Sequence, residues 1–420
     1  MVYLLFCLYL IACSWLLTKI KFVQTSTIDN TLVIFFFLLK VLAGVGAGLL
    51  YAGKPGVDTW IYHNESLIEY DLLLHQPKTY FTNLFYSVYE HGYAGFFSSE
   101  NSFWNDLKTN LIVKILSVFN VFSFGNYYVN VILFNFFVML GSVALFRVFQ
   151  DIYRNNRITI LFGVFLLPSI LFFGSTVHKD GIVFSSLAVI LYFIYNLLQN
   201  KKFRVRDWLI VLFSFSLIFF FRSFVLIILF PFLVAWILSV KLNKNPYVVS
   251  IIGLSISALV LFTIDGLLPS FNPLQVIINK KEAFLSLEKA KSFVDTGVLV
   301  PTLKSFLINF PDAFIMGVFR PFLLDGKMLS FLYPLAIELL FYQVLFLLMI
   351  IYPKNQILKN SNPFVLFTIL FTLTWLLFAG YTVPIVGAIV RYRAIYLPFL
   401  VIPILCNIDW NRVLRLLRIK

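Results

Sequence analysis

Long apolar runs separated by short polar connections dominate the pattern of hydrophobic and polar positions. Because a helix needs roughly 17 to 25 apolar residues to cross the hydrocarbon core of a bilayer, this pattern predicts about eleven transmembrane helices. We therefore expect an all-α, polytopic integral membrane protein. Residues 1–18 lack the basic region and the small-residue cleavage site of a signal peptide, so they are predicted to form the first helix. The predicted spans are residues 2–18, 31–51, 127–146, 158–174, 181–198, 208–221, 223–240, 247–264, 329–351, 363–380 and 394–407.

Two long connections, 52–126 and 265–328, interrupt this alternation. The first contains "WNDLKTNLIVKILSVFNVF" (104–122), whose amphipathic pattern predicts a helix lying along the membrane surface. No internal repeat is apparent, so we predict one membrane domain over residues 1–420 with two such elaborations.

Composition and charge placement agree with a membrane protein. With 60% hydrophobic and only 12% charged residues, a soluble domain is excluded. The net charge of +14 comes from Lys and Arg concentrated in the short connections, so it predicts membrane orientation rather than a nucleic-acid partner. The positive-inside rule places these connections and the C-terminus in the cytoplasm, and the N-terminus and both long connections outside. The three cysteines have no metal-ligand spacing and are expected to be free thiols; they are Cys7, Cys13 and Cys406.

The stretch "GSTVHKDG" (174–181) forms a very short outer turn between two predicted spans. Ser175 or Thr176 can cap the following helix, and Lys179 beside a helix N-terminus makes a small anion site. The alternative is that Lys179 and Asp180 pair with each other and only mark the interface.

Four arginines occupy other outer turns, against the charge bias that orients the chain. An arginine at this depth is costly unless it faces water or an anion, and its planar fork binds phosphate oxygens bidentately. Together with Lys179 they predict an outward-facing cationic cleft. The alternative for each is snorkelling to the headgroups. These arginines are Arg222, Arg320, Arg391 and Arg393.

Two acids complete the set of candidates. Asp58 follows the turn "GKPG" just outside the second span and begins an apparent helix. It can serve as a general base toward a sugar hydroxyl or hold a divalent cation, or it can merely cap the helix. Glu338 is an acid inside a predicted span, which suggests either a function or a pair with an arginine.

Four short motifs carry a resemblance to a known family. They are "GVDTWIY" (56–62), "GSTVHKDG" (174–181), "VFRPFLLDG" (318–326) and "GAIVRYR" (387–393). In this order they resemble motifs of the O-antigen and exopolysaccharide polymerases, within the wider GT-C-type superfamily of membrane glycosyltransferases. Two positions depart from the pattern: Asp325 stands where glutamate is expected, and His178 replaces a small or apolar residue.

The resemblance implies a repeat-unit polymerase of the bacterial inner membrane. It would join undecaprenyl-diphosphate-linked oligosaccharides at the outer face, with a chain-length regulator and a flippase as protein partners beside the membrane lipids. Asp58 and Arg391 would be catalytic. No cofactor and no metal site is expected. Residues expected to bind the diphosphate or the glycan are His178, Lys179, Asp180, Arg222, Arg320, Glu338 and Arg393.

Two other functions fit the same residues. One is a GT-C-type transferase that adds a single sugar from a polyprenyl-phosphate donor, with Asp58 as its acid. The other is a transporter or flippase of lipid-linked glycans, although transporters usually show internal repeats and interrupted helices.

Overall fold

The computed structural model describes residues 2–54, 56–86, 92–93, 102–267, 272–286, 292–325, 332–354 and 362–416. The secondary structure of these residues is helical, without a β-strand. Seven of the described helices are long and apolar enough to cross a membrane, or up to nine if each of two bent helix pairs is one span. The prediction of an all-α, multi-pass membrane protein is therefore confirmed, whereas the count of eleven spans is not.

The seven spanning helices match predicted apolar runs to within a few residues, except that one of them covers two runs. The predicted span 2–18 forms α1 (Val2–Lys19), which is apolar but shorter than these seven. The seven are α3 (Asn30–Tyr51), α7 (Tyr127–Ile152), α10 (Lys179–Leu198), α11 (Val205–Lys241), α12 (Pro246–Leu267), α16 (Tyr333–Ile351) and α17 (Pro363–Thr382).

Two other predicted spans are bent helix pairs. Leu167 is extended before Pro168, as residues before proline usually are, and the helices on either side meet at 46°. The second pair meets at 65° and begins at Val386, eight residues before the predicted span. The pairs are α8 (Arg157–Leu161) with the π-helical segment η2 (Phe162–Leu166) and α9 (Pro168–Ser175), and α18 (Val386–Ala394) with α19 (Leu397–Asn407).

Helix α11 joins the two predicted spans 208–221 and 223–240. A straight helix of its 37 residues would be about 56 Å long, which is nearly twice the ~30 Å hydrocarbon core. Arg222, with φ −149° and ψ 62°, interrupts the helical geometry. The break therefore falls at the arginine that the sequence places between two short apolar segments.

The chain forms two compact units. The first comprises residues 1–147, 170–192 and 206–222; the second comprises 148–169, 193–205 and 223–420. The single membrane domain over 1–420 stays a prediction.

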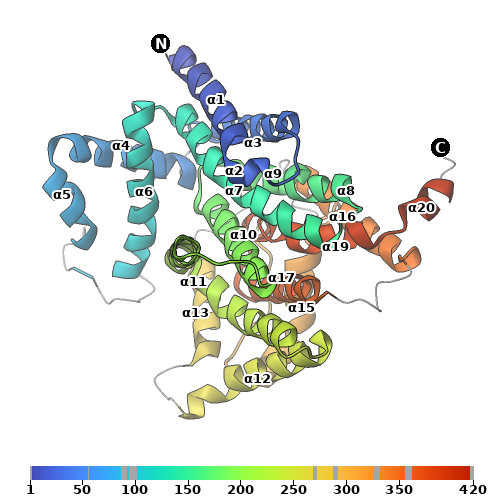
Figure 1. Ribbon diagram of the computed structural model, residues 1–420. Helices are drawn as coiled ribbons and strands as arrows, with labels where there is room; N and C mark the ends of the chain where they lie inside the picture. The colour runs from blue at the N-terminus through green and yellow to red at the C-terminus, as the bar shows by residue number, and fades with distance from the viewer. Residues whose placement is uncertain are drawn as a thin grey trace. The chain divides into compact units, whose positions relative to one another are not determined.

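In the first unit, α1 packs against α3, and the first long connection forms a helical group (Figure 1). Its amphipathic stretch 104–122 is helical, as predicted. Helix α4 packs along α6 and against α5. The elements of this unit not yet given are α2 (Lys21–Gln24), α4 (Asp58–His75), α5 (Pro77–Thr82), the 3-10 segment η1 (Asn83–Phe85) and α6 (Phe103–Ser123).

In the second unit, α17 contacts α12, α13, α15, α18, α19 and the π-helical segment η3. A Cβ atom on Gly317 would collide with the carbonyl of Leu376, and one on Gly380 with the carbonyl of Ala313, so the two backbones touch directly. The further elements are α13 (Pro273–Leu285), α14 (Leu303–Ile308), α15 (Phe310–Phe314), η3 (Ile315–Phe319) and α20 (Trp410–Leu416).

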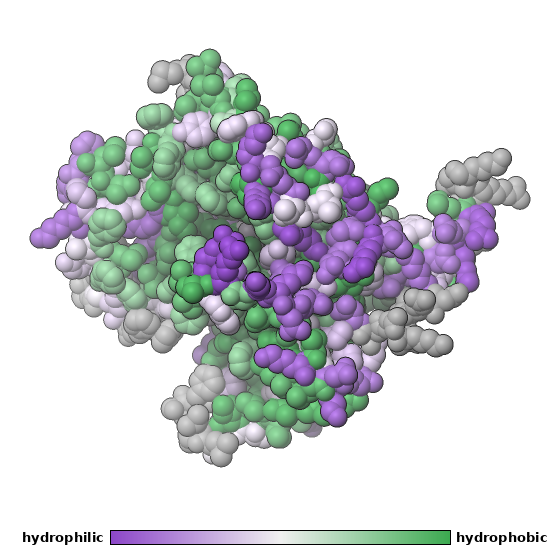
Figure 2. Space-filling model, viewed as in Figure 1, coloured by the Kyte–Doolittle hydropathy of each residue, from purple (hydrophilic) through white to green (hydrophobic). Residues whose placement is uncertain are grey.

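Hydrophobic side chains cover the outer surface of several helices. Figure 2 shows them along α1 and over α12. On α12, Ile251, Ile256 and Leu259 are each more than half exposed. Such surfaces suit lipid rather than water, which agrees with a multi-pass membrane protein; the kind of membrane and the orientation of the termini stay predictions.

Candidate functional site

The turn 176–178 lies between α9 and α10 in the first unit, and close packing fixes it. A Cβ atom on Gly44 of α3 would lie 2.6 Å from the Ser175 carbonyl oxygen, and one on Gly181 would lie 2.6 Å from the Gly174 carbonyl oxygen. Both distances are too short for any side chain, so glycine is required at both positions.

The predicted cap of α10 is wrong. Ser175 belongs to α9, and the Thr176 hydroxyl donates to the carbonyl of Phe172 in that same helix. His178 stands directly before α10 instead, with its Nδ1 3.3 Å from the backbone nitrogen of Asp180.

Four charged or titratable side chains follow one another in a chain of contacts. His178 Nε2 lies 3.1 Å from Asp58 Oδ2, and His178 Nδ1 lies 2.9 Å from Asp180 Oδ2. Arg222 Nη2 donates to Asp180 Oδ1 at 2.5 Å. Asp180 thus has Arg222 and His178 as its close partners, although Lys179 also interacts with it electrostatically. The Arg222–Asp180–His178–Asp58 chain is called the charge chain below.

Burial differs sharply along the charge chain. The side chains of Asp180, His178 and Arg222 are 1%, 8% and 12% exposed, whereas that of Asp58 is 38% exposed. Asp58 is therefore the member that a molecule in solution or at the membrane surface can reach, and the others hold it in place.

Local contacts of α4 explain why Asp58 meets His178. The Thr59 hydroxyl donates to the carbonyl of Val177 at 3.0 Å and lies 2.9 Å from the Tyr127 hydroxyl. Val57, and not Asp58, is the N-cap residue of α4. The reading of Asp58 as only a helix cap is therefore wrong.

Two lysines adjoin the charge chain. Lys179 Nζ lies 3.4 Å from the Thr109 hydroxyl of α6 and 4.9 Å from the ring centre of Tyr62. It interacts electrostatically with Arg222 and Lys108, and also with the carboxylates of Asp58 and Asp180. Burial lowers the pKa of Lys108 to about 8, and the positive charge of Arg222 acts in the same direction. Three cations thus lie near one another, which is the condition for binding an anion.

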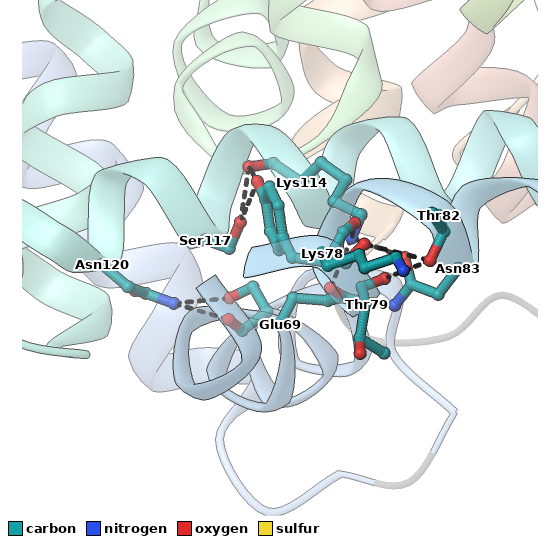
Figure 3. A network of polar contacts seen from close by, with 10 residues as sticks. Glu69, Lys78, Thr79, Thr82, Asn83, Lys114, Ser117 and Asn120 are labelled. Carbon is teal, nitrogen blue, oxygen red and sulfur yellow. Dashed lines mark hydrogen bonds and ion pairs between the residues drawn. The ribbon is translucent and has the colours of Figure 1, made fainter. Parts of the chain in front are cut away.

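A second polar network holds α4 against α6 (Figure 3). Lys114 Nζ of α6 donates to Glu69 Oε2 of α4 at 2.5 Å and to Asn83 Oδ1 of η1 at 2.8 Å. Asn120 of α6 donates to the Ser66 hydroxyl of α4 at 2.9 Å. These contacts hold α4, which carries Asp58, against α6, which carries Lys108.

The second unit contains a buried group around Glu338. Its carboxylate accepts hydrogen bonds from the Ser169 backbone N–H at 3.1 Å, from the Ser169 hydroxyl at 2.9 Å and from the Tyr342 hydroxyl. Arg393, only 2% exposed, interacts electrostatically with Glu338 and donates to the Arg320 carbonyl at 2.7 Å. Glu338 thus receives its hydrogen bonds from Ser169 and Tyr342, and Arg393 acts on it electrostatically, so a direct pair of Glu338 with an arginine stays a prediction. Arg391 is only half-buried.

The structure thus brings Asp58, His178, Lys179, Asp180 and Arg222 together in one unit, and Glu338 with Arg393 and the Arg320 backbone in the other. The cleft that would unite all the predicted cations stays a prediction. Lys108 was not among the site residues predicted from the sequence, although it lies in the amphipathic stretch that forms α6. Ser169 and Tyr342 carried no signal, because isolated hydroxyl groups in apolar segments are common.

Comparison with known proteins finds no family model, no curated protein and no solved structure that matches this chain.

Proposed function

We propose that this protein is a membrane-embedded glycosyltransferase that uses a polyprenyl-diphosphate-linked donor, and specifically a repeat-unit polymerase of cell-surface polysaccharide. The single observation that carries the proposal is Asp58, 38% exposed, held by the charge chain beside Lys179, which in turn lies near Lys108. A carboxylate next to a group of cations suits a reaction that removes a proton from one partner and leaves negative charge on the other.

Asp58 would act as the general base. As the acceptor hydroxyl oxygen bonds to the anomeric carbon of the donor, its proton passes to Asp58. The bond between that carbon and the phosphate oxygen breaks, and its electron pair remains on the lipid diphosphate. His178, 3.1 Å from Asp58 Oδ2, would orient the carboxylate, and Arg222 would hold His178 through Asp180.

The cations would bind the leaving group. A diphosphate needs its developing charge stabilised, and preorganised donors in a water-poor site do this well. Lys179 lies near the Asp58 and Asp180 carboxylates and near Lys108, and its hydrogen bond goes to a hydroxyl. Lys108 reaches an amide oxygen. An anion between them would relieve their mutual repulsion.

Asp58→Asn is the test. It keeps the size and hydrogen-bonding capacity of the side chain but removes the base, so lipid-linked glycan chain growth should fall by about a hundredfold or more. The measurement is the glycan ladder from membranes that contain equal amounts of variant and parent protein. Asp71→Asn on the same helix is the control, because Asp71 is exposed and pairs with His75 of its own helix. A normal ladder from Asp58→Asn would refute the role.

The product of a deletion strain separates the related functions. One capped repeat unit on the lipid supports a polymerase, and an incomplete repeat unit supports a single-sugar transferase.

A transporter of lipid-linked glycans is a second candidate, and interrupted helices favour it. Both bent pairs break within apolar segments, and the N-terminal end of α9 receives the Glu338 carboxylate through the Ser169 N–H. Broken helices whose ends meet charged groups are frequent in secondary transporters. A complete glycan trapped on the inner leaflet of the deletion strain would support this candidate over the enzyme.

A further inference from the structure

A large cavity lies within the second unit, between α16, α17 and α19. Its volume is about 1240 Å³, which exceeds the roughly 300 to 1000 Å³ of a typical small-molecule pocket. Packed protein interiors rarely leave voids larger than one water molecule, so a cavity of this size calls for an occupant.

One stripe of each helix faces the cavity. On α17 the lining residues Leu366, Ile369, Leu373 and Leu376 recur every three or four positions, so they form a single face of the helix. The first three are half-buried, although Phe367 and Phe371 between them are fully packed. The cavity is therefore bordered by a continuous apolar face rather than by a local packing defect.

The cavity is long as well as large. Its lining on α17 runs from Asn362 to Leu376, which is about 21 Å at 1.5 Å per residue. This is about two-thirds of the ~30 Å hydrocarbon core of a bilayer. Water does not fill a cavity with apolar walls favourably, so the shape and lining fit an extended hydrocarbon chain.

One end of the cavity is polar. Lys354, Asn362 and Asn407 line it where α16 has ended, α17 begins and α19 ends. Lys354 is exposed, and its Nζ donates to two neutral oxygens, Asn156 Oδ1 at 3.2 Å and the Cys406 carbonyl at 3.0 Å. Its positive charge is available to an anion at the level of the lipid headgroups.

We propose that this cavity is a lipid-binding site, in which the apolar chain lies along the α17 stripe and an anionic phosphate headgroup meets Lys354. The site is separate from the charge chain, because neither Asp58 nor any other member of that chain lines the cavity. Arg393, which the sequence places among the substrate-binding residues, does line it.

The test uses the purified full chain in phosphatidylcholine vesicles with a trace of phosphatidylglycerol that carries a photoreactive group on its acyl chain. Adducts should map to 362–376 and 397–407. The double variant Leu366→Trp and Leu373→Trp places two bulky rings on the α17 stripe, which obstructs the path of an extended chain, and should lower these adducts roughly tenfold. Leu340→Trp is the matched control, because Leu340 lies on the exposed side of α16 and does not line the cavity.

Lys354→Gln tests the headgroup. This variant should label equally with the phosphatidylglycerol probe and a phosphatidylcholine probe of the same chain, whereas the parent protein should prefer phosphatidylglycerol. Equal labelling of the parent by both probes would overturn the assignment of the anion to Lys354.

A third variant distinguishes loss of lipid binding from loss of folding. Leu373→Ala enlarges the cavity and should retain the adducts, and all variants are compared by size-exclusion profile. Adducts that persist unchanged in the folded double tryptophan variant, or that are absent from both segments in the parent, would overturn the proposal.

Discussion

Burial decides which members of the charge chain can meet a substrate. Asp180 is 1% exposed and contacts both His178 and Arg222, so its carboxylate acts through its neighbours. His178 likewise joins two carboxylates and is 8% exposed. The sequence placed both among the substrate-binding residues; under the proposed function, their burial would make them positioning residues for Asp58.

Binding of a diphosphate-linked donor should weaken as the pH rises past about 8, because Lys108 then loses its positive charge. Its pKa is lowered to about 8 by burial first and by Arg222 second, so its charge is lost just above neutral pH. The KM for the donor should therefore rise between about pH 7 and about pH 9, whereas Lys108→Arg should flatten this rise, because arginine keeps its charge. A parallel rise in the arginine variant would assign the effect to another group.

Unfolding does not explain this pH dependence. The folded pKa of Lys108 lies below its ordinary value of 10.5, so the unfolded chain binds more protons between about pH 8 and that value. Lys108 therefore destabilises the folded state below about pH 8. The folded state becomes more stable as the pH rises from about 8 to 10.5. A measured loss of donor binding over the same range is then an effect on the site.

Helix boundaries followed the hydropathy pattern wherever the helix was uniformly apolar, as for α3 and α12. The pattern failed at α18, because Arg391 and Arg393 looked like the end of a span. The helix includes both, since Arg393 finds the Arg320 carbonyl and the charge of Glu338 inside the unit. Such partners are distant in sequence and leave no local signal.

Arg391 and Arg393 should respond differently to lysine. Two residues apart on α18, they diverge by about 200°, and only Arg393 is fully buried. Arg393→Lys should lower protein abundance, since lysine lacks the planar fork that reaches the carbonyls. Arg391→Lys should leave abundance unchanged, and product should fall by about a hundredfold if its fork binds a substrate phosphate.

Immunoblots and glycan ladders from the same membranes measure both effects. Full-length ladders from Arg391→Lys would show that this arginine only anchors the helix end. Normal abundance of Arg393→Lys would mean that its carbonyl contacts are dispensable.

Gly44 and Gly46 offer a matched pair on α3. A Cβ at Gly44 would lie 2.6 Å from the Ser175 carbonyl, whereas a Cβ at Gly46 would have nothing within 4 Å. Gly44→Ala should therefore destabilise the protein by about 1 to 3 kcal/mol through overpacking. Gly46→Ala should be neutral or slightly stabilising. Thermal unfolding in detergent compares them, and equal melting temperatures would show that α3 can move away from the turn.

For the whole molecule, the sequence predicted the class and most membrane segments, because the bilayer imposes a pattern that composition alone reveals. It also singled out Asp58, His178 and Arg222, since charges stand out in apolar surroundings. It could not pair them: Asp58 and His178 are 120 positions apart, and α4 brings them together through contacts of Thr59 that have no sequence signature.

Membrane sidedness is the remaining prediction at this scale. Cysteines at Lys78 and Ser286, both exposed, should react with an impermeant thiol reagent from outside, and those at Asn200 and Asn243 should not, because of the charge bias of the loops. Thr176, in the predicted outer turn, is too buried to serve as a probe. The background should carry Cys7→Ser, since Cys7 is the exposed native cysteine among the three. The reverse labelling would invert the topology and move the charge chain to the cytoplasmic side.

The glycines around the turn 176–178 bear on how far this sequence can vary. Each charge of the chain could be exchanged for a similar one, but Gly44 and Gly181 face carbonyl oxygens at 2.6 Å and admit no side chain. Distant proteins that share this arrangement should therefore retain the small residues even where the cations have drifted. Their relationship to this chain would be recognised from the spacing of two glycines rather than from any acid or base. One glycine lies in the second apolar run, and the other directly follows His-Lys-Asp.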